Sequence, residues 1–210
     1  MSNLILYNYD LDEGCYRVRL LLSILKLPYE AIAIDMEPGR EHQQPHMLAL
    51  NPTGSLPILR DGDLTLFGTE AILAYLTRAY DKTGQWLPLD PVEFGQIQQW
   101  LGFSQGHLHH AVQARHQALF TPEGATTGDR AAARRAFRIM DDHMTLQQID
   151  GAEFFVGETP TIADIALVAS FALSRDFGQD HDEFPALRRW LRRVRKLGGF
   201  MTMPGIPDYH

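Results

Sequence analysis

Cysteine is nearly absent from this chain of 210 residues, in which Cys15 is the only one. A single cysteine excludes an internal disulfide, a dithiol redox motif and a cysteine-rich zinc site. The chain also lacks a run of 18 apolar residues, and its N-terminus lacks a basic region followed by a long apolar one. We therefore expect neither a membrane span nor a signal peptide, and we expect the protein in the cytoplasm.

The chain has fewer basic than acidic residues, 19 compared with 26, and its formal net charge is -7. Nucleic-acid binding usually needs a basic surface, so this balance argues against it. The hydrophobic content of 45% is ordinary for a globular protein, and the length suits one large domain or two small ones. Small molecules or proteins are the expected partners.

The first eighty residues predict a mixed sheet with helices. Short apolar runs at 4–7 and 31–35 indicate strands, and apolar residues with helical spacing at 16–27 indicate a helix between them, which makes the two strands parallel. Residues 56–67 predict a hairpin around Asp61-Gly62, whose two central positions would both need positive φ. A helix over 69–80 follows. This order predicts a thioredoxin-like α/β arrangement.

Strand signals are missing after Leu89, and the remainder predicts an all-helical domain. Asp90, with Pro91 behind it, predicts the start of a long helix to about Phe120, which Gly102 and Gly106 weaken. Further helices are expected over 130–149, from the Thr161 and Asp164 capping pair through 173, and over 185–197. The predicted division is a first domain at 1–81, a linker at 82–89 and a helical domain at 90–210.

Residues 50–76 deliver a helix N-terminus directly from the end of the sheet. The first N–H groups of a helix are unpaired and its dipole is positive there, so this end suits a carboxylate or phosphate. We therefore expect the ligand at this segment.

Three ordered motifs resemble those of the cytosolic glutathione transferase (GST) superfamily over essentially the whole chain. They are Asn51-Pro52-Thr53-Gly54-Ser55-Leu56-Pro57, the segment Gly68 to Leu76, and the capping pair at Thr161 to Asp164. Arg17-Val18-Arg19 is most similar to zeta-class and related bacterial sequences. The resemblance implies a thioredoxin-like domain followed by an all-helical one, a homodimer, and glutathione as co-substrate without a metal.

The resemblance also implies individual ligand contacts. Pro57 would follow a cis peptide bond, and the backbone of Leu56 would pair with the cysteinyl part of glutathione. Thr69 would bind the γ-glutamyl carboxylate, and Gln43 stands where the family often has a lysine for the glycyl carboxylate. Gly68 departs from the family, which usually has Glu or Gln there for the ligand's ammonium group. Glu70 could supply that charge, or serve only as an acid that favours the helix dipole.

The residue that activates the thiol is ambiguous. The family's serine and cysteine positions fall near Asp12, whose carboxylate would repel a thiolate. Its tyrosine position falls near Asn8, with Tyr7 and Tyr9 adjacent, so Tyr9 is a candidate thiol donor or, alternatively, a surface aromatic residue. Cys15, in the first helical turn, could have a lowered pKa and form a mixed disulfide, or could be a small packing residue.

The acceptor pocket of such a fold would lie on the helical domain. Four histidines with Arg115, together with Trp100 and Phe103, are candidates to line it, although no acidic pair completes a metal site among the histidines. These histidines are His107, His109, His110 and His116. A solvated histidine-rich helix face is the alternative.

The predicted function is that of a glutathione transferase-like enzyme, which activates the thiol of glutathione for attack on an electrophilic small molecule. A glutathione-dependent isomerase similar to maleylacetoacetate isomerase and a Cys15-dependent thiol transferase are alternatives. A third alternative is a non-catalytic glutathione-binding or interaction protein, which Gly68 and Asp12 favour.

Overall fold

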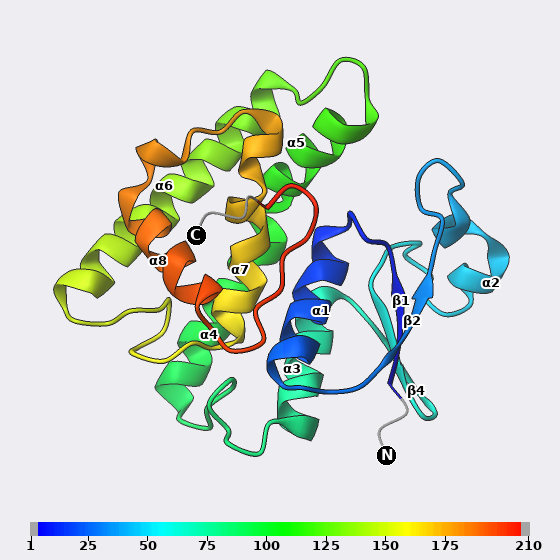
Figure 1. The fold of residues 1–210 in the computed structure, drawn as a ribbon, viewed down its shortest axis with the longest axis horizontal. Coiled ribbons are helices and arrows are strands. Elements are labelled where there is room, and N and C mark those ends of the chain that lie inside the picture. The colour runs from blue at the N-terminus through cyan, green and yellow to red at the C-terminus, as the bar shows by residue number, and fades with distance from the viewer. Residues whose placement is uncertain (1–3, 207–210) are drawn as a thin grey trace.

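A four-stranded mixed sheet forms the first half of the chain, as predicted. The computed structural model describes residues 4–206, and its strands are β1 (Leu4–Asn8), β2 (Glu30–Ala33), β3 (Ile58–Asp61) and β4 (Leu64–Phe67) (Figure 1). The strand order is β2-β1-β3-β4. β1 and β2 are parallel, with Ile5 opposite Glu30, whereas β3 is antiparallel to both β1 and β4. The thioredoxin-like arrangement is confirmed.

The turn between β3 and β4 differs from the prediction. Asp61 pairs with Leu64 and belongs to β3, so the turn consists of Gly62 and Asp63, and only Gly62 has a positive φ, at 58°. One positive φ at the first central position is typical of a type II′ turn. The hydroxyl groups of Tyr75 and Tyr80 both donate to the Asp61 carboxylate, which holds this residue in the strand.

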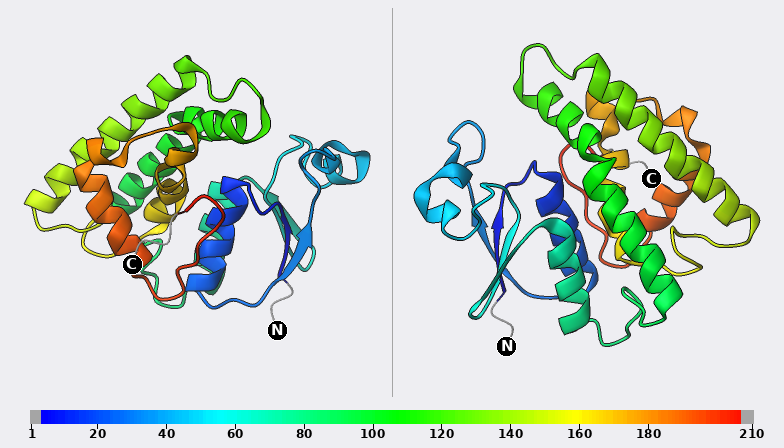
Figure 2. Two further views of the ribbon diagram at one scale, coloured as in Figure 1. Left: turned by 45° about the horizontal axis from the view of Figure 1, so that its top comes forward. Right: turned by 180° about the vertical axis from the view of Figure 1, so that it is seen from behind.

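The helices of the first half are α1 (Glu13–Ile24), the 3-10 helix η1 (Glu41–Gln43), α2 (Pro45–Leu48) and α3 (Thr69–Tyr80). α3 has the predicted bounds. α1 begins three residues before the predicted start, because the Asp12 side chain accepts a hydrogen bond from the Cys15 N–H at 2.7 Å and caps the helix. α1 and α3 lie between the sheet and the helices of the second half, and α2 lies on the other side of the sheet (Figures 1 and 2).

The second half contains helices and no strand among the described residues. Its elements are α4 (Pro91–Gly106), α5 (His109–Phe120), α6 (Thr127–Ile149), α7 (Ile162–Ala172), η2 (Ser174–Phe177), η3 (His181–Glu183) and α8 (Pro185–Arg195). The single long helix predicted from Asp90 is wrong, because α4 ends at Gly106 and α5 begins at His109. Leu108, in the break, is fully buried, so the chain changes direction around a residue of the core.

α7 is the buried centre of the helical half, and all of its residues are buried. The predicted capping box is present: Thr161 accepts from the Ala163 N–H at 3.2 Å, and Asp164 accepts from the Thr161 N–H at 2.9 Å. Asp164 also accepts from the indole N–H of Trp190 at 2.8 Å, which ties α7 to α8. The same carboxylate therefore starts a helix and joins two elements.

One hydrophobic core extends through both halves, from Leu4 in β1 to Ile206 near the end of the described chain. α1 packs against α7 across the boundary. The division at 81 and 90 stays a prediction, because the shared core does not separate two units there. Within residues 4–206, no helix combines the length and apolar character needed to cross a bilayer.

Candidate functional site

The loop before β3 presents free backbone groups at the edge of the sheet. The Leu56–Pro57 peptide bond is cis, as the resemblance implies. Asn51 orders the loop by donating to the Ser55 carbonyl at 2.7 Å and accepting from the Thr53 N–H at 3.0 Å. Among residues 4–206, neither the N–H nor the C=O of Leu56 has a hydrogen-bond partner in the protein. These two groups are available to an extended ligand.

The start of α1, the cis-proline loop and the start of α3 meet at Gly14. A Cβ atom at this position would lie 2.5 Å from the Thr69 hydroxyl oxygen and 2.9 Å from Pro57 Cδ, so only glycine fits there. The two helix N-termini and the backbone of Leu56 therefore face the same region. The sequence predicted Leu56, Pro57 and Thr69 as ligand contacts, and the structure brings them together.

The N-terminus of α3 is open to an anion. Gly68 is the residue before the helix, with a φ of 85°, and no side chain caps the helix there. Thr69 is the first helical residue and is 9% exposed. Its hydroxyl group and the unpaired N–H groups of the first turn suit a carboxylate.

Glu70 points away from Gly68, toward the helical half. Its carboxylate accepts a hydrogen bond from the Gln105 amide at 2.9 Å and lies 3.8 Å from the Arg17 guanidinium. Next to it, α3 and α4 line an open cleft of about 610 Å³. Both carboxylate oxygens of Glu70 are thus already paired. That Glu70 accepts from the ammonium group of the ligand, in place of the residue missing at Gly68, stays a prediction.

A buried polar network under this site was not predicted. Arg17 donates to Ser170 at 2.7 Å and to Ser104 at 3.2 Å, and it lies 3.4 Å from the Glu13 carboxylate. Ser170 also donates to Glu13 at 2.9 Å. The signal available in the sequence was a Glu and an Arg four residues apart on a helix, but their burial depends on α4 and α7, which lie far along the chain.

Gln43 lies on η1, next to the loop that carries Leu56. A Cβ added to Gly54 in that loop would lie 3.8 Å from Gln43 Cγ. The amide oxygen of Gln43 accepts from Arg40 at 2.8 Å, and its side chain is exposed. Its proposed contact with the glycyl carboxylate stays a prediction.

Cys15 is fully buried, and of its two alternatives the structure contradicts the lowered pKa. The thiol packs among Ile34, Met47 and Ile58. Burial, with the nearby Asp12 carboxylate second, raises the pKa of Cys15 well above its ordinary value. The desolvation of the thiolate outweighs the favourable helix N-terminus, and the alternative of a packing residue describes its surroundings.

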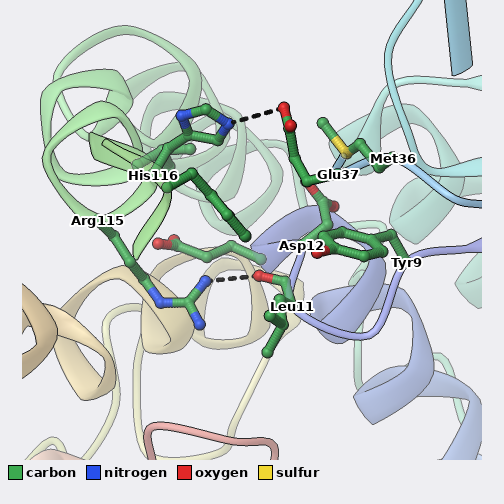
Figure 3. A pocket seen from close by; sticks show the side chains of 10 residues that line it. Tyr9, Leu11, Asp12, Met36, Glu37, Arg115 and His116 are labelled. Atoms are coloured by element: carbon green, nitrogen blue, oxygen red, sulfur yellow. Dashed lines mark hydrogen bonds and ion pairs between the residues drawn. The ribbon is translucent and has the colours of Figure 1, made fainter. Parts of the chain in front are cut away.

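A pocket lies between the loop after β1, the segment after β2 and α5 (Figure 3). The space between its walls is about 340 Å³ when the open solvent at its mouth is included. Its lining residues are Tyr9, Leu11, Asp12, Glu13, Met36, Glu37, Val112, Arg115, His116 and Phe120. The predicted candidates Tyr9, Arg115 and His116 therefore line one cavity, next to the N-terminus of α1.

Tyr9 forms one wall of this pocket, with its ring centroid 6.4 Å from that of Phe120. Burial raises the pKa of Tyr9, and the carboxylates of Glu37 and Asp35 raise it further. The hydroxyl group therefore keeps its proton near neutral pH and can donate a hydrogen bond. Asp12 lies beside it, and burial raises the pKa of this carboxyl group as well.

Two residues of α5 hold the pocket together. Arg115 donates to the Leu11 carbonyl at 2.6 Å (Figure 3) and so fixes the loop after β1. It also donates to the Asp176 carboxylate at 2.8 Å. The His116 ring lies 3.5 Å from the Glu37 carboxylate. α5 thus positions both sides of the cavity.

The remaining predicted pocket candidates lie elsewhere. Trp100 is 4% exposed and packs on Phe155, with ring centroids 4.7 Å apart, so it belongs to the core. Phe103 packs against Trp100 and does not line the pocket. His110 pairs with Asp129 at 2.9 Å on the surface. Within residues 4–206, no group of three or more His, Cys, Asp or Glu side chains could hold a metal ion.

Comparison with known proteins gives one consistent result. Residues 2–78 match the family model for the glutathione S-transferase N-terminal domain, and residues 113–193 match that for the C-terminal domain. Glutathione S-transferase D7 of Drosophila melanogaster is 27% identical over 201 residues, which cover 94% of this chain and 86% of the relative.

Solved structures agree with the sequence comparison. A glutathione S-transferase from Pseudomonas fluorescens is 30% identical with a TM-score of 0.84, and the match covers 97% of this chain and 100% of that one. A glutathione transferase homologue from Drosophila mojavensis, with bound glutathione, is 25% identical with a TM-score of 0.84, covering 94% and 89% of the two chains. The chain therefore belongs to the glutathione S-transferase family and has a glutathione transferase-like function.

Proposed function

We propose that the site binds glutathione along the cis-proline loop and directs its thiol toward Tyr9 and the pocket. The free N–H and C=O of Leu56 would pair with the cysteinyl residue, and the uncapped start of α3 at Thr69 would hold the γ-glutamyl carboxylate. The observation that carries the proposal is the position of these unpaired backbone groups beside an open helix N-terminus. An extended peptide with a terminal carboxylate satisfies both.

The chemistry would be attack of the glutathione sulfur on an electrophilic carbon in the pocket. A sulfur–carbon bond forms, the leaving group departs with its electron pair, and the thiol proton passes to solvent. The Tyr9 hydroxyl can donate to the sulfur and favour its anionic form. Asp12 opposes this effect, because its carboxylate occupies the N-terminus of α1, the other feature that would stabilise a thiolate.

Titration with reduced glutathione in a calorimeter tests the binding. Thr69→Val removes one hydroxyl group at the carboxylate site, and we expect affinity to fall about tenfold or more, since hydrogen bonds to charged groups contribute about 1.5–3 kcal/mol. Thr159→Val, at an exposed threonine far along the chain, is the matched control and should bind normally. Absence of binding at millimolar glutathione would contradict the proposal.

A second candidate function is glutathione binding without catalysis, which the position of Asp12 favours. Asp12→Ser keeps a helix-capping side chain and removes the negative charge. If Asp12 only represses thiolate formation, turnover of an electrophilic aryl halide should rise in this variant. Activity that depends on Tyr9 in the unmodified protein, lost in Tyr9→Phe, would instead support the transferase.

The isomerase and thiol-transferase alternatives need their own assays. A maleyl substrate tests the isomerase, and a mixed disulfide of glutathione tests the thiol transferase. Retention of disulfide exchange by Cys15→Ala would exclude a thiol-transferase mechanism through Cys15, which the buried position of this thiol already opposes.

The organisation of the protein completes the proposal. Residues 1–81 would bind glutathione, 82–89 would link the halves, and 90–210 would line the acceptor pocket. We propose a cytoplasmic homodimer, as the family resemblance implies. Light scattering should then give twice the 23.8 kDa of one chain.

A further inference from the structure

The pocket beside Tyr9 is rich in carboxylates that come from separate parts of the chain. Asp12 and Glu13 begin α1, and Glu37 follows β2. Glu13 is offset by Arg17 in the buried network. The Glu37 carboxylate lies 3.5 Å from the His116 ring. Among residues 4–206 no ion pair involves Asp12, whose carboxylate accepts a hydrogen bond from the Cys15 N–H. Both carboxylates line the cavity, and within residues 4–206 neither forms an ion pair with an arginine or a lysine.

The guanidinium group that lines the same pocket does not provide that charge to a ligand. Arg115 is 4% exposed, and it already donates to the Asp176 carboxylate and the Leu11 carbonyl. Figure 3 shows its guanidinium directed at Leu11 rather than at Glu37. An anionic ligand in the pocket would meet Asp12 and Glu37, and the one arginine among the described lining residues is already engaged elsewhere.

The other walls suit the apolar part of a cation. Tyr9 and Phe120 present aromatic rings, and Leu11, Met36 and Val112 are aliphatic. Aromatic faces attract ammonium groups electrostatically, and this attraction adds to that of nearby carboxylates. Burial is the largest cause of the raised pKa of Tyr9, and the carboxylates of Glu37 and Asp35 raise it further.

We propose that the second ligand of this site, bound beside glutathione, is a small organic cation whose ammonium group pairs with Asp12 and Glu37 and whose apolar part packs on Tyr9 and Phe120. This inference rests on the proposed function for the presence of glutathione, and it names the class of the second ligand. The cation would also offset the Asp12 charge next to the sulfur. A neutral or anionic electrophile would lack both advantages.

Three probes of one shape test the proposal at pH 7: benzylammonium, benzyl alcohol and benzoate. Calorimetry on the full chain, with and without saturating glutathione, should show benzylammonium binding about tenfold more tightly than benzyl alcohol, a difference that one favourable charge contact supplies. Benzoate should bind most weakly. Equal affinity for the alcohol, tighter binding of benzoate, or no binding of benzylammonium would overturn the proposal.

Matched variants test whether Asp12 and Glu37 cause the preference for benzylammonium. Asp12→Asn and Glu37→Gln each remove one charge with little change of shape, and asparagine caps a helix as well as aspartate does. Each should weaken benzylammonium about fivefold or more and leave benzyl alcohol unchanged. Glu158→Gln, at an exposed carboxylate far from the pocket in sequence, is the control. If it weakens benzylammonium equally, the preference for the cation comes from the overall charge of the protein, and the proposed cation site is wrong.

The two proposals fail separately in this design. If glutathione binds and the cation has no preference, the cation site is wrong and the proposed function stands. If benzylammonium binds through Asp12 and Glu37 but glutathione does not bind, the cation site stands and the proposed function is wrong.

Discussion

Removal of the Arg17 side chain should destabilise the protein more than a typical substitution. The side chain is 6% exposed, and it donates to Ser170 at 2.7 Å and to Ser104 at 3.2 Å. In Arg17→Met, the Glu13 carboxylate, 3% exposed, would remain buried without its cation. Removing one partner of a buried ion pair costs about 3–5 kcal/mol, because an uncompensated charge stays in the interior.

We therefore expect Arg17→Met to lower the free energy of unfolding by about 4 kcal/mol, out of a total on the order of 5–15 kcal/mol. The longer contact to Glu70, at 3.8 Å, adds little to this value. For a chain of this size, a loss of about 4 kcal/mol lowers the melting temperature by roughly 8–16 °C. Urea unfolding at pH 7, followed by tryptophan fluorescence and circular dichroism together, measures the change.

The double variant Arg17→Met, Glu13→Gln separates charge from packing. Replacing both members of a buried pair by neutral groups is often nearly neutral, so most of the lost stability should return. A single variant within about 1 kcal/mol of the parent, or a double variant no more stable than the single one, would refute the reasoning.

Three further predictions concern single residues. Gly68→Glu should lower the melting temperature, because a φ of 85° costs a non-glycine residue about 1–3 kcal/mol. The same variant should bind glutathione more tightly, because it restores an acceptor for the ammonium group. Unchanged affinity in calorimetry would show that the ammonium group already has another acceptor. Burial lowers the pKa of His181 to about 4, below its ordinary 6.5. Between these pH values the unfolded chain binds a proton that the folded protein does not, so the free energy of unfolding should fall by about 3 kcal/mol as the pH drops from 6.5 to 4. Urea titrations of the parent and of His181→Gln should show this slope in the parent only; equal slopes would contradict the assignment. Cys15 should react with a thiol reagent such as Ellman's only after unfolding, and rapid labelling of the native protein would contradict its burial.

Local sequence signals predicted the elements correctly where the residues that decide an element lie close together in the sequence. Asp90 accepts from the Val92 and Glu93 N–H groups and starts α4 where expected. The prediction was wrong where a distant contact decides: Asp61 stays in β3 because Tyr75 and Tyr80 hold it, and the helix after Asp90 breaks because Leu108 enters the core.

The candidate site was predictable only in part. Leu56, Pro57 and Thr69 were named from two motifs that lie close together in the sequence, and the structure brings them together. The pocket was predicted only as a set of candidates on one helix, because it combines the loop after β1, the segment after β2 and α5. Glu37 and Met36 had no signal of their own in the sequence.

The sequence by itself determined the family, the order of the elements and the start of α3 at Thr69, since each depends on residues close together along the chain. Only the tertiary structure decided the charge states and partners of the site. Cys15 has a raised pKa instead of a lowered one because β2, α2 and β3 exclude water from it. Glu70 is paired because Arg17 and Gln105 approach it from other helices. Desolvation and charge pairing depend on distances in space between segments far apart in the chain, and local patterns do not contain those distances.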